Sequence, residues 1–85
     1  MAQYKIVIRK SVRKDMQGIP KKDAQRIISA IQSLAENPHP QGSKKLSAQD
    51  RYRLRQGNYR ILYEIQDNQL IVCVVAVGHR KDVYR

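Results

Sequence analysis

The chain has few of the residues that build disulfide frameworks, metal centres and membrane spans. Cys73 is its one cysteine, which excludes an internal disulfide and a cysteine-rich zinc site. It lies in a run of β-branched residues, where a small core side chain is expected. No apolar run approaches the roughly 20 residues of a bilayer-spanning helix. No apolar signal segment follows Met1, so we expect a cytoplasmic protein without a membrane partner.

Acidic residues are also scarce. Seven Asp and Glu stand against seventeen Lys and Arg, which gives a net charge of +10 at pH 7. Residues 1–40 carry eight bases and three acids, and residues 41–85 carry nine and four, so the excess is +5 in each part. Such a charge attracts polyanions, through counterion release where the polyanion is a nucleic acid. We therefore expect a single domain over residues 1–85 whose partner is a nucleic acid, an acidic protein or both.

The hydrophobic pattern predicts the element order β-α-α-β-β-β. Residues 41–49 have the composition of a loop, and Gly78 is expected to end the last strand. The predicted fold is α+β, with two N-terminal helices packed on one face of a mainly antiparallel four-stranded sheet. The predicted strands cover residues 4–9, 51–55, 59–65 and 70–77, and the predicted helices cover residues 11–17 and the segment from Pro20 to just before Pro38.

The second predicted helix has the clearest pattern of the chain. Its apolar residues recur at helical spacing and form one stripe that we expect to lie in the core. The members of this stripe are Ala24, Ile27, Ile28, Ile31, Leu34 and Ala35.

Arginines alternate with apolar residues in the second half of the chain. Successive side chains of a strand point to opposite faces, so Arg53 and Arg55 share a face, and Tyr52 and Leu54 share the other. In the next strand, Arg60 falls on the same outward face as these arginines. We expect the arginines to converge there, with His79 and Arg80 near them.

Such a cluster suits the cleavage of RNA by attack of its own 2′-OH. That reaction needs an acceptor for the 2′ proton, cations for the charged phosphorane and an acid for the departing 5′ oxygen. Arginine forks bind phosphate in a bidentate manner and keep their charge. No ligand cluster for a metal is apparent, so we expect neither a metal nor a cofactor. From the spacing alone, a solvated arginine-bearing surface is about as probable as a phosphate site.

Two segments resemble the RelE branch of the RelE/ParE toxin superfamily. They are YRLRQGNYRILY at residues 52–63 and VGHRKDVY at residues 77–84, and with the element order the resemblance covers essentially the whole chain. The resemblance implies the toxin of a type II toxin–antitoxin system, a ribosome-dependent mRNA endonuclease that enters the ribosomal A site. It also implies an acidic antitoxin, encoded by the adjacent gene, that holds the toxin inactive.

The resemblance also implies roles for single residues. Arg60 matches an arginine thought to stabilise the transition state, Arg80 matches a proposed general acid, and Tyr84 matches a tyrosine that orients the substrate. Further cations that we expect to contact RNA are Lys44, Lys45, Arg51 and Lys81.

The identity of the general base stays open. Arg53 and Arg55 match positions where relatives carry basic residues that act as the base or bind the phosphate. Arginine accepts protons poorly because its pKa exceeds ~12. His79, with an intrinsic pKa near ~6.5, is the other candidate for this role.

Two other functions fit the same resemblance. A ParE-like toxin would inhibit DNA gyrase by binding, without cutting RNA. A third possibility is an inactive module that only sequesters an antitoxin. The combination of Arg60, Arg80 and Tyr84 favours the nuclease, because a gyrase inhibitor has no need of a set of residues suited to phosphate.

Overall fold

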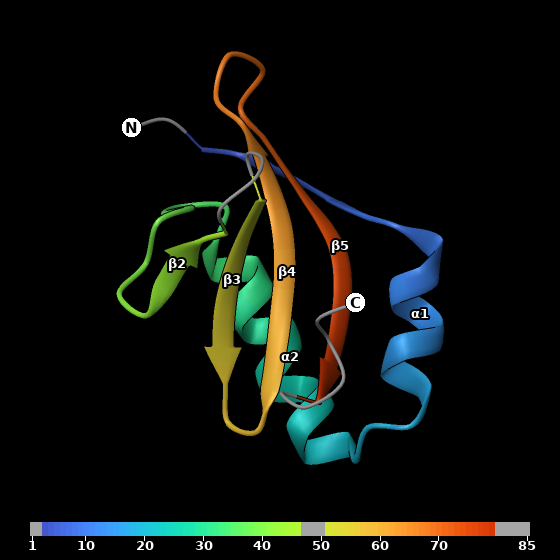
Figure 1. Cartoon of the computed structure of the whole chain (residues 1–85). Helices are drawn as coiled ribbons and strands as arrows, with labels where there is room; N and C mark the ends of the chain where they lie inside the picture. Colours follow the sequence, from blue (N-terminus) through green and yellow to red (C-terminus); the bar gives the residue numbers. More distant parts are fainter. Residues whose placement is uncertain (1–2, 47–50, 80–85) are drawn as a thin grey trace.

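The protein folds into one sheet with two helices, in a computed structural model that describes residues 3–46 and 51–79. The elements are β1 (Lys5–Ile8), α1 (Lys10–Gln17), α2 (Lys21–Ser33), β2 (Ser43–Lys45), β3 (Arg51–Gln56), β4 (Tyr59–Gln66) and β5 (Ile71–His79). The strand order is β1-β5-β4-β3-β2, with β1 parallel to β5 and the other neighbours antiparallel. Figure 1 shows α2 behind the sheet and α1 beside β5. The predicted α+β class is confirmed.

The strand count differs from the prediction of four. β2 lies within residues 41–49, which were expected to be a loop, and it pairs with β3 at the edge of the sheet. Its sequence, Ser-Lys-Lys, lacks the apolar alternation by which a strand is detected, and polar residues are typical of protected sheet edges. The predicted end of the last strand at Gly78 is also wrong. β5 continues to His79 because Gly78 pairs with Arg60 of β4.

The first helix completes the hydrogen bonding of β5. β1 pairs with β5 only from Ile71 to Val74. Further along β5, the backbone N–H of Val77 donates to Oδ2 of Asp15, in α1, at 3.1 Å. A buried N–H without an acceptor is costly, so Asp15 provides on this side of β5 what β1 provides earlier in the strand.

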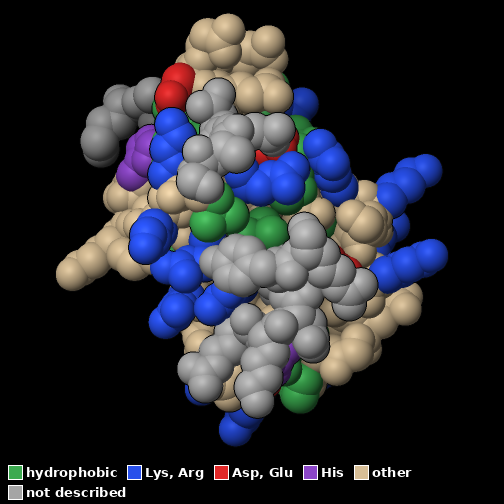
Figure 2. Space-filling view, viewed as in Figure 1, with side chains coloured by type: hydrophobic (Ala, Val, Ile, Leu, Met, Phe, Trp, Pro, Cys, Tyr) green, Lys and Arg blue, Asp and Glu red, His purple; other side chains and the backbone are tan. Residues whose placement is uncertain are grey.

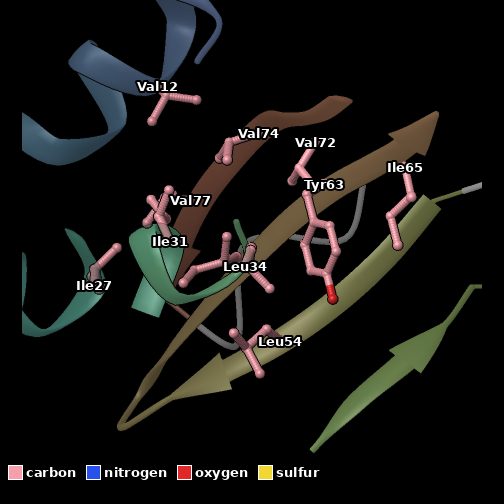
Figure 3. Close-up of a cluster of buried hydrophobic side chains, with 11 residues drawn as sticks. Val12, Ile27, Ile31, Leu34, Leu54, Tyr63, Ile65, Val72, Val74 and Val77 are labelled. Atoms are coloured by element: carbon pink, nitrogen blue, oxygen red, sulfur yellow. The ribbon is translucent and has the colours of Figure 1, made fainter. Parts of the chain in front are cut away.

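The core lies between the sheet and the helices (Figure 3). Its buried side chains are Val12, Ile27, Ile31, Leu34, Leu54, Ile61, Tyr63, Ile65, Val72, Val74 and Val77. The predicted stripe on α2 is only partly confirmed, since Ile27 is 0% exposed whereas Ile28 is 47% exposed. The prediction of a core position for Cys73 is wrong. Cys73 is half-buried on the other face of the sheet, where it pairs with Glu64.

Neither of the two helices in the described residues has the length and apolar character that crossing a bilayer requires.

The phenol of Tyr63 is expected to make stability depend on pH in the alkaline range. Tyr63 is fully buried, and its hydroxyl donates to the carbonyl oxygen of Pro38 at 2.9 Å. Burial raises the pKa of Tyr63 from 10.0 to about 12. The folded state therefore holds this proton more tightly than the unfolded state, and the resulting stability, complete below pH 10, is lost as the pH rises towards 12. At pH 11 the loss is about 1 kcal/mol.

Chemical denaturation at pH 9 and pH 11 tests this prediction. Tyr63→Phe removes the titrating group and keeps the ring, so its loss of stability between the two pH values should be smaller than that of the wild type by about 1 kcal/mol. Equal losses in the two proteins would show that Tyr63 does not cause the effect.

Candidate functional site

The face of the sheet opposite the helices carries a concentration of cations. Arg51, Arg53 and Arg55 alternate with Tyr52 and Leu54 along β3, and the register of the sheet places Arg60 of β4 and Lys44 of β2 on the same face. We call this set the arginine face: Lys44, Arg51, Arg53, Arg55 and Arg60. Figure 2 views the molecule from this side and shows Lys and Arg side chains around a small apolar strip.

The register sets like charges directly opposite one another. Arg55 pairs with Arg60, and Lys44 pairs with Arg53. Side chains directly opposite in an antiparallel pair have Cβ atoms about 4.5–5.5 Å apart, and like charges at that distance destabilise a sheet. A bound anion between them would reverse the sign of this interaction. The arrangement can therefore accommodate an anionic ligand such as phosphate.

The carboxylate of Glu64 balances one end of the arginine face. Arg51 donates from Nη2 to Oε2 of Glu64 at 2.9 Å, and Arg9, which follows β1, lies 3.9 Å from the other oxygen of Glu64. Arg51 was predicted to contact RNA, but the structure engages it with Glu64. Arg55 and Arg60 lie at the opposite end of the face, four residues away along each strand, where the register sets two arginines opposite each other.

An apolar floor lies between the cations, and sequence reasoning missed it. Leu62 of β4 is only 6% exposed, although it shares its strand face with Arg60, and Val75 of β5 is buried as well. Leu62 pairs with Arg53 on one side and with Ala76 on the other, and Val75 is the extra residue of a β-bulge. The signal in the sequence was the apolar Leu62 at an outward position between two charged residues.

Three arginines of this face are buried along their stems. The Nε atoms of Arg51, Arg53 and Arg60 are buried from solvent. Arginine can lay its aliphatic stem along an apolar surface and keep its guanidinium head accessible. Stems packed in this way limit the positions that the guanidinium groups adopt, which favours a preorganised anion site.

Two predicted site residues lie elsewhere. Lys45 pairs with Tyr52, so it points to the helix side of the sheet and away from Lys44. His79 pairs with Tyr59, and the two rings make an edge-to-face contact with centroids 5.8 Å apart. The expectation that His79 joins the arginines is therefore wrong as a placement. The strand continues through Gly78, and alternation then directs the next side chain to the other face.

Three predicted site residues, Arg80, Lys81 and Tyr84, lie outside the described residues. Arg53, Arg55 and Arg60, by contrast, are brought together as expected. Their guanidinium groups can bind a phosphodiester from several sides and stabilise the extra negative charge of a phosphorane.

Comparison with known proteins identifies the family. The sequence model described as "ParE toxin of type II toxin-antitoxin system, parDE" matches residues 6–84. A putative RelE-like toxin protein of Escherichia coli is 34% identical, over 96% of this chain and 90% of the relative. Toxin RelG of Mycobacterium tuberculosis is 27% identical, over 96% of this chain and 97% of the relative.

Solved structures agree with the sequence comparison. A chain of the archaeal RelE–RelB complex from Pyrococcus horikoshii superposes with a TM-score of 0.84 at 27% identity, covering 98% of this chain and 100% of that one. A chain of the RelBE2 toxin–antitoxin complex from M. tuberculosis gives 0.79 at 26% identity, covering 92% and 99%. The chain therefore belongs to the ParE toxin family of type II toxin–antitoxin systems, and it is a RelE-like toxin.

Proposed function

We propose that this toxin is a metal-independent endoribonuclease that cleaves mRNA on the ribosome and thereby inhibits translation. The observation that carries the proposal is the register of the sheet on the arginine face, which sets Arg55 opposite Arg60 and Lys44 opposite Arg53. A net charge of +10 supports binding to a polyanion as a whole. The scissile phosphate would lie over the end of the face that bears Arg55 and Arg60.

The proposed chemistry is attack of the 2′-OH on the adjacent phosphodiester, which forms the P–O2′ bond, breaks the P–O5′ bond and transfers the 2′ proton to a base. Arg53, Arg55 and Arg60 would bind the phosphate and stabilise the phosphorane. Arg80 would protonate the departing 5′ oxygen, and Tyr84 would orient the substrate. These last two roles rest on the resemblance to RelE toxins.

The location of His79 affects whether it can act as the base that accepts the 2′ proton. Its ring lies against Tyr59 on the helix side, which argues against direct proton transfer from a phosphate held by Arg55 and Arg60. Arg53 and Arg55 accept protons poorly, so we assign them to phosphate binding. The role of His79 stays a prediction, which the pH profile of a His79→Gln variant would test.

A cognate acidic antitoxin is the proposed protein partner. The similar toxins from P. horikoshii and M. tuberculosis were solved in complex with their antitoxins. The charge of this chain is suited to an acidic polypeptide as well as to RNA. We propose that the adjacent gene encodes that antitoxin and that the complex is inactive.

Inhibition of DNA gyrase is the second candidate function. The family model that matches residues 6–84 is described as a ParE toxin, and this observation favours a toxin that acts by binding alone. The nuclease has the stronger support, because the resemblance to RelE toxins matches Arg60, Arg80 and Tyr84 to residues suited to phosphate, which a gyrase inhibitor does not need.

A reconstituted translation system separates these functions. We expect purified toxin to break a translated mRNA within codons when ribosomes are present and to leave the same RNA largely intact without them. Primer extension maps the breaks. Rapid cutting of free RNA would refute ribosome dependence, and intact mRNA together with inhibited supercoiling by purified gyrase would favour the second candidate.

A further inference from the structure

A second basic site lies on the helix side of the sheet. It is an open cleft of about 630 Å³ between α2 and the end of β3. Lys22 and Arg26 are one helical turn apart on α2. Gln25 and Ser29 are also one turn apart and line the cleft beside them. Gln56 closes the cleft from β3, and none of the described lining residues is acidic. The lining therefore offers two cations and three polar side chains able to donate hydrogen bonds.

The cleft and the arginine face lie on opposite sides of one end of the sheet. Arg55 and Gln56 are consecutive in β3, so their side chains point to opposite faces. Arg55 belongs to the arginine face, and Gln56 lines the cleft. Figure 1 shows the β3–β4 turn at the same end of the molecule as the start of α2. An RNA strand bound across the arginine face would have to bend around the β3–β4 turn to reach the cleft, so a different segment of polyanion suits the cleft better.

The chemistry of the cleft favours RNA over protein. Protein interfaces depend on buried apolar anchors, and Ala30 is the only apolar side chain among the described residues that line the cleft. The apolar surface of α2 lies on its other flank, where Ile28 borders a separate groove together with Ile8 and Met16. Cations with amide and hydroxyl groups are instead the usual ligands of phosphate and ribose oxygens.

We propose that this cleft binds the phosphodiester backbone of a folded RNA that is distinct from the strand cleaved at the arginine face. The inference rests on the proposed function, because the ribosome is the folded RNA that this toxin would meet. The toxin then lies between two RNA surfaces, with the translated strand on one side of the sheet and structural RNA on the other. Contacts of this kind give affinity and orientation without reading a sequence.

Charge reversal in the cleft tests the proposal against a matched control. The variant Lys22→Glu/Arg26→Glu changes the cleft, and Lys10→Glu/Lys14→Glu changes two exposed lysines one turn apart on α1 by the same total charge. Lys22→Glu and Lys10→Glu each place an acid in the first turn of a helix, where it is favourable, whereas Lys14→Glu removes a favourable basic residue from the last turn of α1. All four positions are exposed, so both variants should still fold. Circular dichroism verifies the fold of each.

The measurement is the affinity for purified 70S ribosomes over a series of KCl concentrations. The cleft variant should bind about tenfold or more weakly, and its plot of log affinity against log salt should be shallower by about 1.5, as expected for two lost phosphate contacts. The α1 variant should lose less than a third of that binding free energy. Equal losses in the two variants would overturn the proposal, because net charge would then explain the effect.

Other outcomes separate this inference from the proposed function. Wild-type toxin without affinity for ribosomes contradicts the proposed function itself. Wild-type toxin that binds and cuts, with a cleft variant that binds equally well, contradicts the inference alone. A cleft variant that binds ribosomes normally but no longer binds the antitoxin would assign the cleft to a protein and also overturn the inference.

Discussion

Replacing Arg60 with alanine is expected to lower the rate of ribosome-dependent mRNA cleavage by roughly 10²–10³-fold, the usual effect of removing one preorganised donor from a charged transition state. Arg60 lies directly opposite Arg55, and its Nε is buried, so its guanidinium approaches the proposed phosphate from a defined direction. The loss should appear in single-turnover cleavage with saturating ribosomes, because the chemical step and not ribosome binding is affected. Growth arrest on expression should be lost in parallel.

Two controls make this result specific. Arg13→Ala removes an exposed arginine from α1, at the same cost in net charge, and should keep the cleavage rate within about twofold, as expected for a residue outside the site. Arg60→Ala should remain folded in thermal unfolding, because the removal of one of two like charges that face each other offsets the loss of a buried stem. Full cleavage activity in folded Arg60→Ala would contradict the proposed role of the arginine face.

Ile27→Ala is expected to destabilise the fold by about 2–5 kcal/mol, whereas Ile28→Ala should cost less than about 1 kcal/mol. The two isoleucines are consecutive in α2, so the change in helix propensity is the same. They differ in burial, at 0% and 47% exposed. Ile27→Ala leaves a cavity among packed neighbours, while Ile28→Ala trims a side chain that already contacts solvent.

Thermal unfolding measures the difference. One kcal/mol corresponds to about 4–8 °C for a domain of this size, so Ile27→Ala should unfold at least 8 °C below the wild type. Ile28→Ala should stay within several degrees of it. Similar losses in both variants would mean that the packing of α2 against the sheet differs from the one described.

Several features could be predicted because they depend on local pattern. The order of the main strands and helices follows from hydrophobic periodicity, and α1 formed close to its expected ends. The predicted end of the second helix just before Pro38 is wrong, since α2 ends at Ser33. Alternation in β3 placed Arg53 and Arg55 on one face without knowledge of the fold. The segments at residues 52–63 and 77–84 were enough to predict the family and that the protein is a toxin.

Other features depended on pairing between distant segments. β2 has no apolar pattern of its own and is a strand only because β3 offers it an edge. The face of the sheet on which the His79 side chain lies depended on whether β5 continued through Gly78. Gly78 pairs with Arg60, so the strand continues and His79 lies on the helix side. The hydrogen bond from the Val77 N–H to Asp15 joins residues 62 positions apart, so no local pattern in the sequence predicts it.

The sequence by itself determined the fold class, the excess of positive charge and the common face of the β3 arginines, because each follows from composition or from the twofold period of a strand. Tertiary structure decided which isoleucine of α2 is buried, which cations face each other across strands, and that Gln56 meets Lys22 and Arg26 around a cleft. These depend on strand register and on how the helices pack against the sheet. Both are settled by contacts between residues far apart in the chain, where local periodicity carries no information.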